Sequence, residues 1–344
     1  MARAPHDTQA RTIAAMILVA GLLGCTVAAR VAQDPPAPPA SGPLPRAVAF
    51  LSTEVPRWRR EEGCYSCHNN GDAARALMRA ARAGFDVAAP LADTLAFLGN
   101  PSRWEGGRKG PFEDRVLARI QFAGALVTAV ETGLAPPDAL PAAARLVAAD
   151  QRPDGSWRLD ASDSLGTPAT YGTALVTWAA RRVLVAAAID DDGARDAIAR
   201  ATAFLVARDP ATTPDAAAVV LALADDAGAP AVAAHRTARD RLLAWQTPGG
   251  GWGPYPTVRP EPFDTAIAVL ALLDVRPDAT ARAAARRGQA FLRSTIQADG
   301  AWLETTRPAG QLSYAQRLST AGWATLALLA DDADVTGTGP LRGR

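Results

Sequence analysis

The chain has 344 residues, of which 49% are hydrophobic and 21% are charged, so it can bury a large core. The formal net charge is only +1, and the basic side chains form neither a run nor a stripe, which argues against a nucleic-acid-binding protein. Alanine and arginine dominate while runs of β-branched residues are few, and this composition favours helices.

Residues 1–33 resemble an export signal. A positively charged start precedes an apolar run over residues 13–23, which is too short to span a bilayer comfortably. Two cleavage sites compete: residues 27–29, VAA, suit a signal peptidase, whereas residues 22–25, LLGC, resemble a bacterial lipobox with Cys25 as the lipidated first residue. An uncleaved signal anchor is a third interpretation. We expect a bacterial protein that is exported to the periplasm or anchored in the inner or outer membrane as a lipoprotein.

Residues 34–45, DPPAPPASGPLP, form a proline-rich segment that is typical of an extended linker. Such a linker would hold a folded domain away from a membrane. We expect the folded domain to cover residues 46–331 and residues 332–344 to form a flexible tail.

A repeated pattern of glutamine, a glycine turn and tryptophan organises the folded domain. Three copies read RLVAADQRPDGSW, RLLAWQTPGGGW and RGQAFLRSTIQADGAW, and they end at Trp157, Trp252 and Trp302. The glycines supply left-handed turn geometry. We expect each tryptophan ring to be buried with its N–H hydrogen-bonded, and each glutamine amide to bond the backbone of a neighbouring repeat. The chain is therefore a tandem array of helix–turn–helix units.

Apolar spacing and turn residues predict six helix pairs. The first helices of the pairs centre near Phe50, Phe97, Leu146, Phe204, Leu243 and Phe291. The second helices begin near Asp72, Asp114, Ala169, Asp215, Phe263 and Ser313. The second helices carry almost no charge in their central turns and should form an inner wall, whereas the first helices have a charged face and should form an outer wall. The predicted fold class is all-α, a single α/α toroid.

The glutamine–glycine–tryptophan repeats resemble the QW repeats of squalene/hopene cyclases and related prenyltransferase toroids, most closely over Gly288–Trp302. The resemblance implies an α/α toroid over residues 46–331. Cyclases of that family have two toroids and an acidic DxDDTA motif at the start of an inner helix, but the matching residues 262–266 here keep only Asp264. The Asp, Cys and His zinc ligands of protein prenyltransferases are also absent. Catalysis stays open at this point, and these departures favour a non-catalytic role.

Asp264 has two interpretations. It can act as an acid at the mouth of an apolar cavity, where burial would raise the pKa of its carboxyl group. The side chains that would line this cavity are Tyr171, Tyr255, Phe263, Tyr314 and Trp323. Alternatively, Asp264 caps the N-terminus of a helix, and the recurrence of aspartate at comparable helix starts favours this second interpretation. The sequence has no phosphate loop, serine-nucleophile elbow or dinucleotide fingerprint, so we expect no nucleotide cofactor.

The segment CYSCH, residues 64–68, has the CxxCH spacing of covalent haem attachment. Cys64 and Cys67 would form the two thioether bonds of a haem c, and His68 would be the proximal iron ligand. Export, the lack of any other cysteine in the folded domain and the position between the helices of the first repeat support this interpretation. The sequence also resembles bacterial exported toroid proteins that carry CxxCH at this place.

A sixth iron ligand is harder to find. Met78 follows His68 closely on the same predicted helix, so a core methionine is favoured over a ligand, and we expect an open or water-held position. Two alternatives remain for the cysteines. They can form a disulfide in an oxidising compartment, or they can hold zinc with His68 and a fourth ligand such as His235 or Asp72.

The main prediction is an exported toroid that carries haem c and serves electron transfer, or the binding of an apolar ligand coupled to the haem. Its redox partner or apolar small molecule is not identified by the sequence. One alternative is a cyclase-like or prenyltransferase-like enzyme that acts on an isoprenoid with Asp264 as its acid. The other is a non-catalytic binding or scaffold toroid with a Cys64–Cys67 disulfide. A cavity lined by carboxylates would favour the enzyme, and a cavity filled by side chains would favour the scaffold.

Overall fold

The structure, a computed structural model, describes residues 41–107, 110–111, 115–158, 171–274, 277–305 and 313–330. These residues belong to one compact unit. The predicted signal region with Cys25, most of the predicted linker and the predicted tail lie outside the described residues. Within the described part of the chain, no helix combines the length and the apolarity needed to cross a bilayer.

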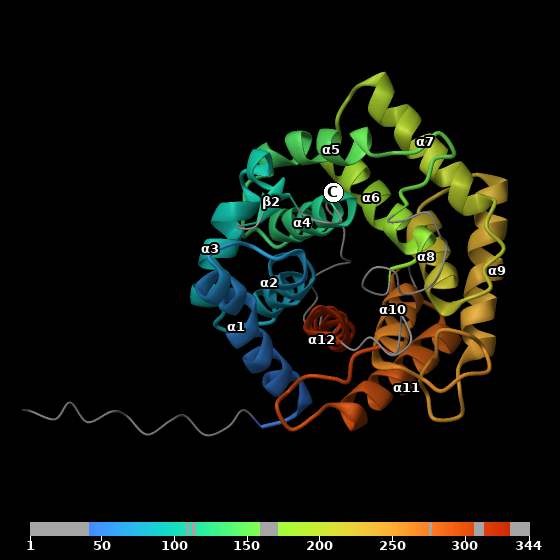
Figure 1. Ribbon diagram of the computed structural model, residues 1–344. Helices are drawn as coiled ribbons and strands as arrows, with labels where there is room; N and C mark the ends of the chain where they lie inside the picture. The colour runs from blue at the N-terminus through green and yellow to red at the C-terminus, as the bar shows by residue number, and fades with distance from the viewer. Residues whose placement is uncertain are drawn as a thin grey trace, which may run out of the picture. The chain divides into compact units, whose positions relative to one another are not determined.

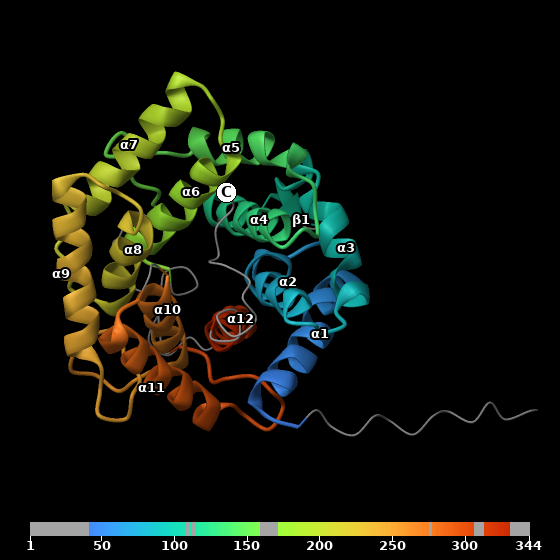
Figure 2. The same cartoon turned by 180° about the vertical axis from the view of Figure 1, so that it is seen from behind.

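Twelve α-helices in the described residues form two concentric rings (Figures 1 and 2). The outer ring consists of α1 (Pro43–Glu62), α3 (Ala88–Leu98), α5 (Leu140–Ala149), α7 (Asp192–Val206), α9 (Ala229–Trp245) and α11 (Ala279–Thr295). The inner ring consists of α2 (Ala74–Arg82), α4 (Arg115–Glu131), α6 (Thr173–Ala187), α8 (Thr213–Leu223), α10 (Pro262–Leu273) and α12 (Tyr314–Leu329). Each inner helix packs against the next, and α12 packs against α2 to close the ring. The predicted α/α toroid of six helix pairs is confirmed.

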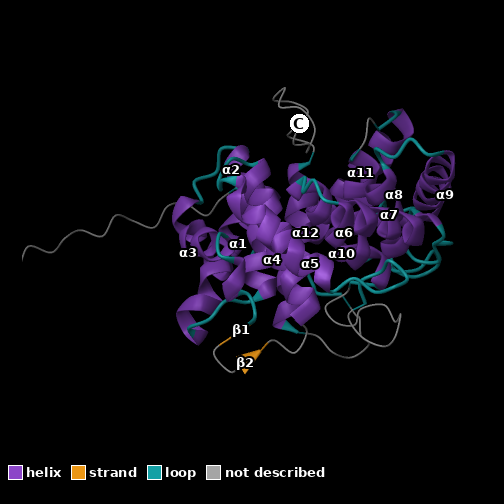
Figure 3. Ribbon diagram, turned by 90° about the horizontal axis from the view of Figure 1, so that it is seen from above, coloured by secondary structure: helices purple, strands orange, loops and turns teal. Residues whose placement is uncertain are grey.

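The remaining elements are short. A π-helix, η1 (Cys67–Ala73), leads into α2, and two 3₁₀ turns, η2 (Pro101–Arg103) and η3 (Pro137–Ala139), precede later helices. Two strands, β1 (Gly106–Gly107) and β2 (Gly110–Pro111), pair antiparallel with Gly106 opposite Pro111. Figure 3 shows this pair on one face of the ring.

The helix starts follow the predicted ones closely where both can be compared. Ser313 is the N-terminal capping residue of α12, and its side chain accepts a hydrogen bond from the backbone of Gln316. Helix α1 begins at Pro43, inside the segment predicted as the linker, because proline is well tolerated in the first turn of a helix. The predicted starts at Asp114 and Ala169 lie outside the described residues.

The three repeat tryptophans make the same hydrogen bond. Their indole N–H groups donate to the carbonyl oxygens of Val147, Leu242 and Leu292, at 2.7, 2.7 and 2.8 Å for Trp157, Trp252 and Trp302 respectively. All three rings are fully buried. Each ring therefore joins the turn to the end of the preceding outer helix, as the repeat predicts.

The glycine of each turn has left-handed backbone geometry, with φ +87° at Gly155, +87° at Gly250 and +91° at Gly300. A Cβ atom at Gly250 would lie 2.7 Å from the carbonyl oxygen of Arg287 in the next outer helix. The last turn packs in the same way against Arg46 in α1. The glycines are therefore required by both conformation and close packing between repeats.

The glutamine prediction is confirmed for two repeats and wrong for the third. The amides of Gln151 and Gln246 each donate to a carbonyl of the next outer helix, at 2.8 Å. The amide of Gln297 instead donates to Thr295 within its own repeat. The neighbour of this last repeat is the first helix, α1, and there Arg46 donates to the backbone carbonyl of Gln297.

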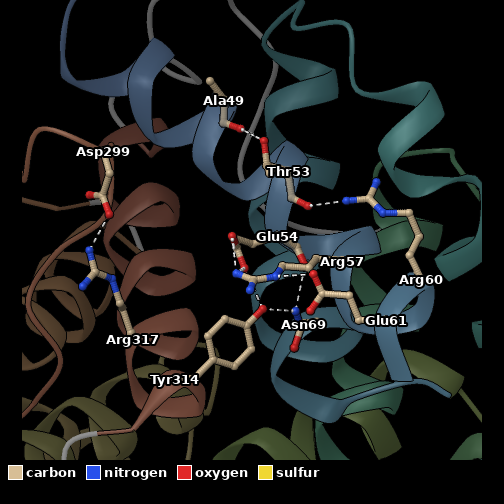
Figure 4. A network of polar contacts seen from close by, with 10 residues as sticks. All are labelled: Ala49, Thr53, Glu54, Arg57, Arg60, Glu61, Asn69, Asp299, Tyr314 and Arg317. Carbon is tan, nitrogen blue, oxygen red and sulfur yellow. Dashed lines mark hydrogen bonds and ion pairs between the residues drawn. The ribbon is translucent and has the colours of Figure 1, made fainter. Parts of the chain in front are cut away.

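Polar contacts complete the closure of the ring between α12 and α1 (Figure 4). The hydroxyl group of Tyr314 donates to Glu54 at 2.7 Å and accepts from Asn69 at 2.8 Å. The ring of Tyr314 also stacks on Trp58, with 6.1 Å between centroids. The first and last helices of the toroid are thus joined by hydrogen bonds as well as by packing.

Candidate functional site

A buried carboxylate lies in the inner ring, just before helix α2. Asp72, in η1, is only 1% exposed. Its Oδ1 atom accepts a hydrogen bond from the Tyr171 hydroxyl at 2.6 Å. Its Oδ2 atom accepts from the Gln121 amide at 2.7 Å and from the Ser319 hydroxyl at 2.8 Å. Because Gln121 lies on α4, Ser319 on α12 and Tyr171 just before α6, this carboxylate joins four segments of the inner wall.

Two glycines allow η1 to approach its neighbours. A Cβ atom at Gly71 would lie 2.9 Å from the Cβ of Gln121 in α4. A Cβ atom at Gly322 in α12 would lie 3.0 Å from the Cα of Ala73. Both distances are shorter than side chains tolerate, so glycine at these positions sets the depth at which Asp72 enters the inner wall.

Two asparagines fasten η1 to the outer helix α1. The Asn69 amide donates to the backbone carbonyl of Glu54 at 2.7 Å, and the Asn70 amide donates to that of Val55 at 3.3 Å. The side chain of Asn70 also accepts from the backbone N–H of Ser66 at 3.0 Å. These bonds satisfy the N–H₂ groups of both amides and orient the segment that carries His68 and Asp72, whereas the Oδ1 atom of Asn69 is buried without a hydrogen-bond partner in the described part of the chain.

His68 is linked to Asp72 through a serine. The Nδ1 atom of His68 lies 3.3 Å from the Oγ atom of Ser319, which in turn donates to Asp72. Burial lowers the pKa of His68, and the nearby Asp72 opposes this shift. The imidazole is therefore neutral at neutral pH and can exchange a proton through the serine hydroxyl.

Aromatic rings surround the carboxylate on the lumen side. Tyr171, Phe263 and Trp323 contact one another, with centroid distances from 6.1 to 6.4 Å. The Trp323 indole N–H donates to the Tyr171 hydroxyl at 3.2 Å. Burial raises the pKa of Tyr171 well above its usual value, and the Asp72 carboxylate adds to this effect. The hydroxyl of Tyr171 therefore remains protonated and donates to Asp72.

Three of the residues predicted to line the cavity come together in this way, and two do not. Tyr314 lies in the contact between α12 and α1, and Tyr255 is 46% exposed. Asp264 is fully buried in the first turn of α10, where the capping residue is Glu261. The interpretation of Asp264 as the helix cap is wrong, because α10 begins two residues earlier at Pro262.

A cationic group of side chains follows Asp72 along the lumen. Arg79 and Arg182 both pair with Glu131, and the Arg182–Glu131 distance is 2.7 Å. Arg75 stacks over Trp323, with its guanidinium carbon 4.7 Å from the ring centroid. Burial lowers the pKa of Arg79 to about 10, so its guanidinium group remains charged at neutral pH.

A small cavity lies between these groups. Its volume is about 10 Å³, which is room for about one water molecule. The lining side chains come from the carboxylate, aromatic and cationic groups: Asp72, Arg75, Ile120, Gln121, Gly124, Tyr171, Trp178, Ala179 and Arg182.

The CxxCH residues extend from just after the end of α1 into the start of η1. Cys64 and Cys67 are half-buried thiols, and the His68 ring contacts Ser319. Met78 is fully buried in the core of α2, as expected for a core methionine. Among the described residues, no group of three or more His, Cys, Asp or Glu side chains is placed to hold a metal ion, so the zinc alternative has no supporting ligand set.

Sequence reasoning did not single out Asp72 as the centre of a site. It marked this aspartate as a helix start and as a zinc ligand in one alternative. The available signal was a carboxylate shortly after a histidine and two asparagines, in a turn that had lost the repeat pattern. The partners Gln121, Tyr171 and Ser319 are far apart in the sequence, and only the closed ring brings them together.

No protein-family model matches the sequence, and no curated protein matches it either. Solved structures do resemble the chain. The type II terpene cyclase MstE from Scytonema, in its apo form, has a TM-score of 0.55 and 14% identity over 85% of this chain and 99% of that chain. A variant of MstE in complex with its substrate geranylgeranyl dihydroxybenzoate has a TM-score of 0.54 and 14% identity over 84% and 97% of the two chains. A protein from Actinoplanes has a TM-score of 0.55 and 17% identity over 84% and 98%.

These similarities establish the fold, an α/α toroid of the terpene-cyclase type, in agreement with the squalene-cyclase-like toroid predicted from the repeats. The main functional prediction, a haem-binding toroid for electron transfer or redox-linked ligand binding, is wrong. Among the similar structures, MstE is a type II terpene cyclase, and it matches the enzyme alternative better than the haem-binding prediction. The haem motif identified in the sequence occupies the segment that carries the Asp72 site.

Proposed function

We propose that the protein is an isoprenoid cyclase that starts its reaction by protonating a carbon–carbon double bond, with Asp72 as the acid. The observation that supports the proposal is a carboxyl group buried beside aromatic rings and held by three hydrogen-bond donors. The similarity to terpene-cyclase toroids, one of which binds a geranylgeranyl substrate, supports the substrate class.

In the first step, the O–H bond of the Asp72 carboxyl group breaks and a C–H bond forms at one carbon of a trisubstituted alkene. The resulting tertiary carbocation is attacked by the electrons of the next double bond, which closes a ring. Loss of a proton to a base ends the sequence, so the product is an isomer of the substrate and no electrons are exchanged with a cofactor. Tyr171, Gln121 and Ser319 stabilise the carboxylate that remains after the proton has moved. The face of Phe263 stabilises the cation, whereas the ring of Trp323 already carries the guanidinium group of Arg75.

The acid must be reprotonated after each turnover. Ser319 lies between Asp72 and His68, with its oxygen within 2.8 Å of one and 3.3 Å of the other. A neutral imidazole can accept a proton and return it through a hydroxyl group. We assign His68 and Ser319 to this proton path.

Asp72 replaces Asp264 as the proposed acid. Both are buried aspartates at the start of inner helices, but Asp72 lines the cavity in the lumen and Asp264 does not. The aromatic group of Tyr171, Phe263 and Trp323 is linked to Asp72 by the hydrogen bond from the Tyr171 hydroxyl. Asp264 therefore provides a matched control for the role of a buried carboxylate.

The small volume of the cavity beside Asp72 favours a second function, a non-catalytic toroid that binds a ligand or a partner. A substrate of isoprenoid size enters only if lumen side chains such as Tyr171 and Trp178 change conformation on binding. The cyclase proposal therefore includes this rearrangement, whereas the non-catalytic toroid does not require it.

The test is incubation of the purified chain with geranylgeranyl dihydroxybenzoate and with unsubstituted polyprenes, followed by mass spectrometry and NMR of the products. We expect a product of unchanged mass with fewer double bonds. Asp72→Asn should lower the rate by a factor of about 10³ or more, because an amide cannot donate this proton. Asp264→Asn should retain activity when it folds.

Activity in Asp72→Asn would overturn the assignment of the acid. A wild-type chain that forms no cyclised product from any of these substrates would overturn the cyclase and leave the non-catalytic toroid. Circular dichroism and thermal unfolding of both variants establish that lost activity does not come from lost structure.

A further inference from the structure

Arg75 is a nearly buried cation with unused hydrogen-bond donors. Its side chain is only 11% exposed. Its closest carboxylate contact is an ion pair with Asp72 at 3.9 Å, which is too long for a hydrogen bond. The Nε atom is buried without a hydrogen-bond partner in the described part of the chain. The side chain is held instead by stacking over Trp323.

The neighbouring arginines differ from Arg75 in this respect. Arg79 and Arg182 both form charge-assisted hydrogen bonds with the carboxylate of Glu131. A guanidinium group has five N–H donors, and a buried cation is normally paired and hydrogen-bonded. Burial lowers the pKa of Arg75, and the charge of Arg182 adds to this effect. Arg75 is therefore the member of this group whose charge is least compensated.

The charged side chains that line the cavity are Arg75, Arg182 and Asp72, and Arg182 also pairs with Glu131 outside it. When Asp72 carries the proton that the proposed reaction transfers, two positive charges face one negative charge. Arg75 and Arg182 both line the cavity, which has room for about one water molecule. An anionic group would enter between them with the side-chain rearrangement that the proposed function includes, and it would then receive hydrogen bonds from two guanidinium groups.

We infer that Arg75 and Arg182 form a binding site for an oxyanion, a carboxylate or phosphate group. If the oxyanion is the head group of an isoprenoid substrate, this part of the inference rests on the proposed function. A free small anion that binds beside the acid has the same chemistry. The guanidinium stacked on Trp323 is already oriented, so little side-chain entropy is lost when the anion binds.

The experiment is isothermal titration calorimetry of the full chain with an isoprenoid carboxylic acid, with the alcohol of the same chain length, and with inorganic phosphate and acetate. The acid should bind the wild-type chain at least about tenfold more tightly than the alcohol. Arg75→Gln should abolish this preference, and Arg75→Lys should retain part of it because the charge remains. Arg82→Gln is the matched control, since Arg82 is an exposed arginine on the same helix, and it should change nothing.

Binding of phosphate or acetate alone, lost in Arg75→Gln, would assign the site to a free anion. Equal affinity of the wild-type chain for acid and alcohol, together with no binding of phosphate or acetate, would overturn the oxyanion site. An acid preference that survives in a folded Arg75→Gln variant would also overturn it. These measurements detect binding and do not require turnover. The oxyanion site can therefore be disproved even if the chain catalyses cyclisation, and it can be confirmed even if the chain does not.

Discussion

Segment η1 of the first repeat occupies the place that the glycine turn has in the later repeats. The two kinds of segment make different contacts. In three later repeats, a buried tryptophan bonds the end of the outer helix and a glycine contacts the next one. In the first repeat, η1 enters the inner wall and places His68 and Asp72 beside α4 and α12. One kind of connection joins repeats to each other, and the other brings polar groups from several repeats to one point.

The difference teaches where to look for function in a repeat protein. Side chains that recur in every repeat satisfy contacts that every repeat must make, so their recurrence is explained by packing. A repeat that departs from the pattern still has to close the ring and can carry different chemistry. Here the departing segment has exchanged a tryptophan for a hydrogen-bonded carboxylate.

The largest effect should come from Gly155→Ala. The left-handed backbone and the clash with the Arg200 carbonyl oxygen should lower the free energy of unfolding by about 3 kcal/mol. Gly84→Ala is the control, because Gly84 has φ +89° but no atom within 4 Å of the added Cβ, and it should lose about 1 kcal/mol. Urea unfolding measures both values. Equal losses in the two variants would show that contact between repeats does not depend on this glycine.

The next effect should come from Gly71→Ala in η1. The added methyl group would meet Gln121 at 2.9 Å, so η1 must move away from α4, at a cost of about 2 kcal/mol. The same shift should weaken the Gln121–Asp72 hydrogen bond and lower cyclase activity. Gly124→Ala, which adds a methyl group in open space on the same inner helix α4, should leave stability unchanged or raise it by up to about 1 kcal/mol. Normal stability of Gly71→Ala would contradict the close packing of η1.

The repeats allowed the fold to be predicted from the sequence, but not the site. Glycine and tryptophan at fixed spacing identify helix pairs, because their conformational and packing requirements are local. The Asp72 site depends on side chains from four inner segments, and no local pattern specifies which of them meet. The CxxCH spacing was interpreted as haem attachment because it is also a local signal, although the fold uses this segment to place His68 against Ser319.

A smaller effect should distinguish the glutamines of two repeats. Gln246→Ala should lower the free energy of unfolding by about 1 kcal/mol, because its amide bonds the next outer helix at Ala284. Gln297→Ala should lose about 0.5 kcal/mol, because its amide bonds only Thr295 in its own repeat. Thermal unfolding of the two single variants checks the order. A larger loss for Gln297→Ala would contradict the assignment of the contact between repeats.

The smallest effect should be a pH dependence that comes from His68. Burial holds the pKa of the folded His68 below the ordinary value of 6.5, so below about pH 6.5 the unfolded chain binds a proton that the folded chain does not. The free energy of unfolding should therefore fall as the pH decreases from 6.5, and His68 should contribute no slope above that value. Burial also lowers the pKa of His235 on α9, and this contribution has the same sign.

The effect of His68 is best measured in a His235→Gln background, where thermal unfolding is followed from pH 7.5 to pH 5. His68→Asn keeps a polar atom near the position of Nδ1 and can still contact Ser319. Its melting temperature should decrease less steeply with acidification than that of the His235→Gln parent. If both curves have the same slope, the imidazole is solvated in the folded chain, and His68 is then not a member of the buried network. A flatter curve would show that His68 is buried in the folded chain, as the proposed proton path through Ser319 requires.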